Sequence, residues 1–169
     1  MLGKGIVCGN PNFGASNIAM TAAGYYYSSL HAWNVMCNEA MRVKSEESQS
    51  KYTVEMAHAM PAITNMAFAC ELAFKSLLPD EDRPNSHRLR VIYEMLSPEY
   101  QRDIQGRVMG FPCVSNEEDF INKLDECSNN FVDWRYFYEG RHRRIQGHYT
   151  MLKAMAEEVF DRYGIEYPD

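Results

Sequence analysis

The sequence lacks a long hydrophobic run and a paired-cysteine motif, and each absence excludes a class of protein. No stretch approaches the roughly 20 apolar residues of a membrane span, and no secretory signal pattern is present. The cysteines are five, an odd number, widely scattered and without a CxxC pair, which argues against a disulfide framework or a structural zinc. They are Cys8, Cys37, Cys70, Cys113 and Cys127. We therefore expect a reduced, cytoplasmic protein that does not associate with membranes.

The chain also lacks an excess of positive charge, except in one segment. Its formal net charge is -6, which argues against nucleic-acid binding through the whole surface. Residues 133–148 nevertheless carry four arginines against two acidic residues, a net charge of +2, which leaves -8 for the rest. Aromatic side chains immediately precede these arginines in "FVDWRYFYEGRHRRIQGH" (131–148). The composition thus permits a local site for phosphate groups.

The apolar residues recur at helical spacing, and no strand pattern or internal repeat is present. We predict an all-α protein, a helical bundle of four to five helices in one domain over residues 17–169. A flexible Gly/Asn-rich leader is expected over residues 1–16. The expected helical segments are 17–43, 50–78 (kinked or restarted at Pro61), 86–96, 98–108, 117–139 and 148–163. Ser115 and Glu118 have capping-box spacing before the fifth segment, and Gly164 follows the last one.

Three motifs occur in an order that resembles one family. "ELAFKSLL" supplies Glu71 and Lys75, "SHRL" supplies His87, and "WRYFYE" begins at Trp134. Together these stretches resemble HEPN domains over roughly residues 50 to 160. The resemblance implies a HEPN-like helical bundle that usually dimerises, so a homodimer is expected. It also implies either metal-independent endoribonuclease activity through an R-x(4–6)-H motif, or binding of RNA or nucleotides without cleavage.

Two arginine–histidine pairs fit that motif. Arg135 and His142 have six residues between them, and Arg143 and His148 have four. The resemblance makes these four the candidate catalytic residues, with Arg141 and Arg144 as candidate nucleic-acid-binding residues. The chemistry is reasonable without a metal or cofactor, because a histidine can take the 2′-hydroxyl proton while an arginine stabilises charge on the phosphate.

The spacing of the first pair limits how it can work. On one straight helix, Arg135 and His142 would lie about 10 Å apart along the axis, too far to grip one phosphate together. Either a break at Gly140 or a second protomer would be needed. A homodimer is therefore expected on geometric grounds as well.

Other interpretations stay open. Phe131, Trp134 and Tyr138 form a stripe at helical spacing, so the segment can be a core helix followed by a solvated basic turn. The chain would then be a non-enzymatic interaction protein that binds or inhibits a partner. A companion protein such as an antitoxin is also conceivable.

A different class is indicated by two E-x-x-H motifs. Glu55 with His58 and Glu139 with His142 have the spacing that di-iron helix bundles use twice, and Glu39 and Glu71 could supply further carboxylates. Because Glu139 and His142 lie among arginines, a dication is disfavoured there. We predict no metal site and no cofactor.

Overall fold

The computed structural model describes residues 13–45, 55–128 and 148–168. These residues form six α-helices and two short 3-10 helices, and no strand occurs among them. The elements are α1 (Phe13–Ser45), η1 (Glu55–His58), α2 (Ala59–Ser76), η2 (Asp80–Asp82), α3 (Leu89–Met95), α4 (Pro98–Met109), α5 (Glu117–Cys127) and α7 (Tyr149–Tyr163). The predicted all-α bundle is confirmed. No helix within the described ranges combines the length and apolar character needed to cross a membrane.

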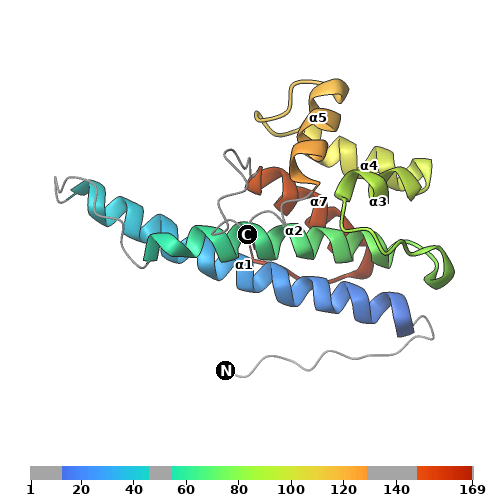
Figure 1. Cartoon of the computed structure of the whole chain (residues 1–169), viewed down its shortest axis with the longest axis horizontal. Helices are drawn as coiled ribbons and strands as arrows, with labels where there is room; N and C mark the ends of the chain where they lie inside the picture. The colour runs from blue at the N-terminus through green and yellow to red at the C-terminus, as the bar shows by residue number, and fades with distance from the viewer. Residues whose placement is uncertain (1–12, 46–54, 129–147, 169) are drawn as a thin grey trace.

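The hairpin of α1 and α2 is the base of the bundle. The two helices lie side by side along the molecule, and the C-terminal part of α1 extends beyond the other helices (Figure 1). Buried positions in both helices are rich in alanine, and small side chains allow helix axes to lie close together. These alanines are Ala19, Ala22, Ala23 and Ala32 in α1, and Ala62, Ala67, Ala69 and Ala73 in α2.

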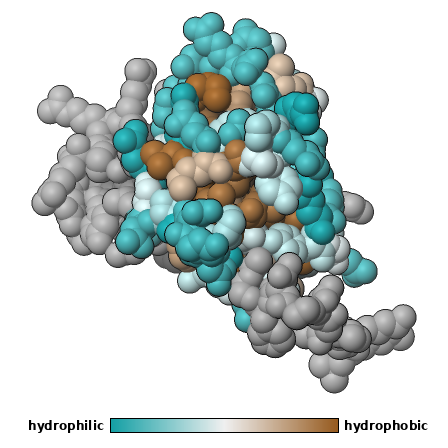
Figure 2. Space-filling model, turned by 90° about the vertical axis from the view of Figure 1, so that its right-hand side faces the viewer, coloured by the Kyte–Doolittle hydropathy of each residue, from teal (hydrophilic) through white to brown (hydrophobic). Residues whose placement is uncertain are grey.

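The remaining helices cover one side of this hairpin. α7 packs against α1, α2 and α4, while α3 packs against α2 and α5, and α4 also contacts α5 (Figure 1). Large side chains fill the space between the layers, among them Tyr26, Phe74, Phe120, Ile104 and Phe160, all fully buried. Apolar surface is gathered in the middle of one face, where hydrophilic residues surround it (Figure 2).

The last helix ends where the sequence predicts. Gly164 follows α7 with φ of 61°, a left-handed conformation that glycine adopts without steric penalty. The amide of Ile165 donates to the carbonyl of Phe160 at 3.0 Å, which turns the chain back toward the bundle. Ile165 and Tyr167 then pack against the core.

Two helix starts refine the prediction. α1 begins at Phe13, four residues inside the predicted leader, while residues 1–12 lie outside the described part of the chain. The predicted helix over 50–78 divides at the 3-10 helix η1, and α2 begins at Ala59. Pro61 thus lies in the first turn of α2, where its missing N–H leaves no helical hydrogen bond unmade.

Around α5, two predictions are wrong. The N-cap is Asn116, whose side chain accepts from the Asp119 amide, instead of Ser115 with Glu118. α5 ends at Cys127, so the predicted continuous helix over 117–139 is interrupted at Ser128, and residues 129–139 lie outside the described part of the chain. The helix ends there because Ser128 forms hydrogen bonds with the start of α3. Its hydroxyl accepts from the Arg90 amide at 3.0 Å, and its carbonyl accepts from the Leu89 amide at 3.4 Å. Ser128 therefore supplies the cap that α3 lacks locally.

Candidate functional site

Most of the predicted site lies outside the described residues. This applies to Arg135, Arg141, His142, Arg143 and Arg144. The sixth residue, His148, is described, and it occupies the N-cap position of α7. The two proposed arginine–histidine pairs therefore stay predictions, and only the surroundings of His148 can be analysed.

His148 is held by an acidic side chain of α5. Its Nε2 lies 2.5 Å from Oε2 of Glu126, and both side chains are partly exposed. A carboxylate on one ring nitrogen fixes the orientation of an imidazole. The contact also joins the end of α5 to the start of α7, so the described residues on either side of residues 129–147 lie close together.

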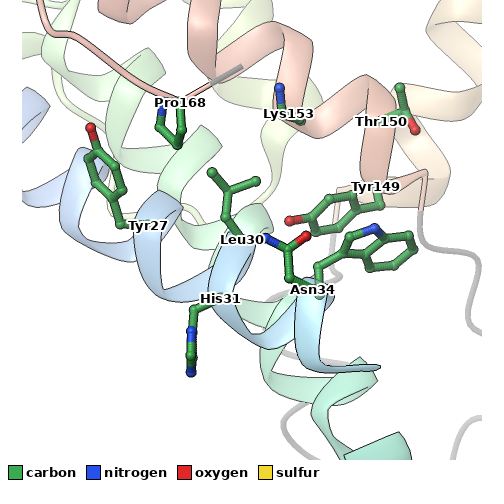
Figure 3. Close-up of a pocket in the computed structure, with 9 residues that line it drawn as sticks. Tyr27, Leu30, His31, Asn34, Tyr149, Thr150, Lys153 and Pro168 are labelled. Carbon is green, nitrogen blue, oxygen red and sulfur yellow. The ribbon is translucent and has the colours of Figure 1, made fainter. Parts of the chain in front are cut away.

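A pocket of about 450 Å³ opens beside the start of α7. Its walls come from α1, from the first turns of α7 and from the C-terminal segment after Gly164 (Figure 3). The lining residues are Tyr27, Leu30, His31, Trp33, Asn34, Tyr149, Thr150, Lys153 and Pro168. In the close-up, the side chain of His31 points away from α7, whereas that of Leu30 points toward it (Figure 3). Tyr149 and Thr150 directly follow His148, so the pocket adjoins the end of the basic segment.

The aromatic part of this pocket is a stacked pair. The rings of Trp33 and Tyr149 are nearly parallel, at 7°, with centroids 4.0 Å apart. Burial raises the pKa of the Tyr149 hydroxyl, and this hydroxyl lies 3.1 Å from Oγ of Ser29, within hydrogen-bond distance. The Ser29 hydroxyl also lies 2.6 Å from the carbonyl of Ala62 on α2. These bonds fix Tyr149, and Tyr149 in turn supports one face of Trp33.

The charged part of the pocket is Lys153. It forms an ion pair with Glu157, one turn further along α7. Glu157 is buried and has two more donors: the Tyr26 hydroxyl at 2.5 Å, and Arg107 at 3.3 Å. Burial and the neighbouring carboxylate both raise the pKa of Tyr26, so it remains a hydrogen-bond donor. Three donors therefore converge on a single buried carboxylate behind the pocket.

The C-terminal segment is fastened to the same network. The Arg107 guanidinium contacts Asp161 as well as the hydroxyl of Tyr167, the latter at 2.7 Å. Tyr27 donates to the carbonyl of Glu166 at 2.7 Å. These contacts hold Pro168 in place as the wall of the pocket that lies across from α1 (Figure 3).

A second buried carboxylate, Glu71, lies on α2. Lys75 contacts it at 2.8 Å, and Nδ1 of His87 lies 3.0 Å and 3.1 Å from its two oxygens. The stretches "ELAFKSLL" and "SHRL" thus meet in space, since Glu71 comes from the first and His87 from the second.

Only Glu39, His58 and Glu71 of the di-iron hypothesis have side chains in the described part of the chain. Glu39 pairs with Arg42 at 2.7 Å, and Glu71 is occupied by Lys75 and His87. Among the described residues, no three His, Cys, Asp or Glu side chains group so that they could hold a metal ion. Glu139 and His142 lie outside those residues, so that half of the hypothesis has no structural description.

Sequence reasoning missed the pocket itself. Trp33 looks like one position of a helical core stripe, and nothing local indicates that Tyr149, far along the chain, stacks on it. The spacing of Tyr149 and Lys153, four residues apart, was available as a sign that both share a face of α7. This spacing alone does not predict a pocket, because the pocket also needs the residues of α1.

Comparisons of this chain with family models, with curated proteins and with solved structures gave no match.

Proposed function

We propose that this protein binds RNA at the end of the bundle where α5 and α7 meet. The arginines of residues 135–148 contact phosphates there, and the stacked pair of Trp33 and Tyr149 offers an aromatic surface for a base. The observation that carries this proposal is position. The basic segment ends at His148, and the next two residues line an aromatic pocket.

The charge distribution supports local rather than general binding. The rest of the chain carries about -8, so RNA is repelled from most of the surface and attracted to one segment. Arginine is suited to this role because its planar group binds phosphate oxygens with two parallel hydrogen bonds. The HEPN-like motifs agree with this function, and a homodimer would place two such segments in one particle.

Cleavage is the more specific hypothesis within this proposal. His148, held by Glu126, has the carboxylate partner that a general acid or base needs for a fixed orientation. Arg143 would then stabilise charge on the phosphate, as the R-x(4–6)-H spacing implies. Such a reaction requires no metal, so it should proceed in a chelator and leave 2′,3′-cyclic phosphate ends.

The experiment measures binding and cleavage of a labelled single-stranded RNA in the presence of EDTA. We expect affinity to fall steeply as salt rises, because phosphate contacts release counterions. If cleavage occurs, His148→Ala should slow it by a factor on the order of a hundred or more, as expected for loss of an acid/base group. His87→Ala is the matched control, since His87 is also an exposed histidine that contacts a glutamate, Glu71, but it does not line the pocket.

The outcomes separate the alternatives. RNA that is bound with this salt dependence but stays intact leaves the binding proposal standing and removes the nuclease. A chain that binds no RNA at low salt contradicts the proposal, and a protein partner would then be the target to seek.

A further inference from the structure

Lys153 is held less firmly than its ion pair with Glu157 implies. The lysine precedes the glutamate by four residues, which is the less favourable orientation of such a pair on a helix. Its side chain keeps 28% of its surface exposed, whereas that of Glu157 keeps only 6%. Lys153 can therefore turn toward the pocket, while Glu157 cannot follow.

The negative charge of Glu157 stays compensated when Lys153 turns away. The Tyr26 hydroxyl and the Arg107 guanidinium still donate to it. A buried carboxylate left without donors would be strongly destabilising, but one that keeps two donors is not. The network behind the pocket thus leaves the positive charge of Lys153 available to an anion.

The other side chains that line the pocket indicate which chemical groups the anion has besides its negative charge. Trp33 has one face covered by Tyr149 and remains partly exposed within the pocket, so it can stack on a planar ring. Asn34 and Thr150 offer hydrogen-bonding groups that suit the edge of a base. The volume of about 450 Å³ lies in the range typical of small-molecule sites, roughly 300–1,000 Å³.

We infer that this pocket binds one nucleoside phosphate unit, with its base on Trp33 and its phosphate on Lys153. The inference rests on the proposed RNA-binding function, which it deepens by assigning the pocket to a single nucleotide. The unit is either a free nucleotide or the 5′-phosphorylated end of an RNA, since both present the same chemistry. Lys153 is the residue that discriminates a phosphorylated ligand from a nucleoside.

The test titrates AMP and adenosine against the full chain by calorimetry. Trp33 fluorescence in a Trp134→Phe background provides a second readout, since the chain has only these two tryptophans. We expect AMP to bind and to quench Trp33, and adenosine to bind roughly tenfold more weakly, as one charge-assisted contact is lost. Lys153→Met should weaken AMP by a similar factor and leave adenosine unchanged. Lys153→Arg should restore most of the AMP affinity.

Lys123→Met is the matched control. Lys123 also pairs with a carboxylate one turn away, Asp119 on α5, and its exposure of 19% is comparable, but it does not line the pocket. This variant should bind AMP like the unchanged protein. Thermal unfolding of each variant checks that the fold is kept.

Three results overturn the inference: AMP does not bind, Lys153→Met binds it as tightly as the unchanged chain, or adenosine binds as tightly as AMP. If RNA still binds with a steep salt dependence in any of these cases, the RNA-binding proposal survives and only the pocket assignment fails. Competition by short RNAs shows whether the bound nucleotide unit is a free nucleotide or an RNA end. Displacement of AMP by 5′-phosphorylated but not 5′-hydroxyl RNA assigns the pocket to an RNA end, and displacement by neither assigns it to a free nucleotide.

Discussion

Glu71 and Glu157 are both buried glutamates with a lysine one helical turn away, but their surroundings differ. Glu71 precedes its lysine, the favourable order, and its second partner, His87, keeps 51% of its side chain exposed. Glu157 follows its lysine and is also bound by the fully buried Tyr26 and by Arg107. The lysine of the second cluster, Lys153, lines the pocket beside the start of α7.

This difference indicates two roles for similar residues. The Glu71 cluster ties α2 to the segment before α3, and its lysine has a well-oriented partner, so we assign it to the structure. In the Glu157 cluster, the carboxylate has three donors, and one of them, Lys153, lines a pocket. The two donors that remain on the buried acid allow the lysine to serve a ligand.

The largest expected effect is the loss of stability when each glutamate is replaced. Glu157→Ala leaves the buried Tyr26 hydroxyl without its acceptor and should cost about 3–5 kcal/mol. Glu71→Ala should cost less, about 2 kcal/mol, because its second partner, His87, keeps 51% of its side chain exposed, whereas Tyr26 is fully buried. Urea unfolding measures both.

Glu157→Gln provides the control for that comparison. The amide keeps the volume and can still accept from Tyr26, so part of the loss should be recovered. A Glu71→Ala protein that unfolds at lower urea than Glu157→Ala would contradict the ranking of the two clusters.

A smaller effect on stability is expected at the partly exposed Asp119–Lys123 pair of α5. The contact with Lys123 and hydrogen bonds from the amide and hydroxyl of Ser115 lower the pKa of Asp119 to about 2. Because the pKa is lowered in the folded state, Asp119 stabilises the fold above its unfolded pKa of about 3.9. That contribution is lost as pH falls toward 2.

Asp119→Asn should therefore be less stable than the unchanged chain at pH 7 and equally stable near pH 2. Urea unfolding at several pH values measures this difference. A gap between the two proteins that stays constant from pH 7 to pH 2 would show that the carboxylate charge does not act as described.

Local sequence signals predict the helices well, and contacts between distant residues account for what they miss. The apolar period and Gly164 define α7 to within one residue, because both signals act within a few residues. The end of α5 at Cys127 was missed because Ser128 is recruited by the amides of α3, about 38 residues earlier. No local pattern carries that information.

The candidate site divides in the same way. Composition alone identifies the basic segment 133–148, since charge is a property of the residues themselves. The pocket depends on the stacking of Trp33 on Tyr149 and on the donors that converge on Glu157 from α1 and α4. Those are products of the fold, which is why Lys153 was not among the predicted site residues.

The most direct test of the central claim is photo-crosslinking of a 5-iodouridine-containing RNA to the full chain, followed by mass spectrometry of the peptides. We predict adducts on the peptide with Trp33 and on peptides from residues 135–148, because bases stack on the first and phosphates are held by the second. Added salt should reduce both. Adducts confined to α3 and α4, or no adduct at low salt, would contradict the assignment of RNA binding to the end of the bundle where α5 and α7 meet.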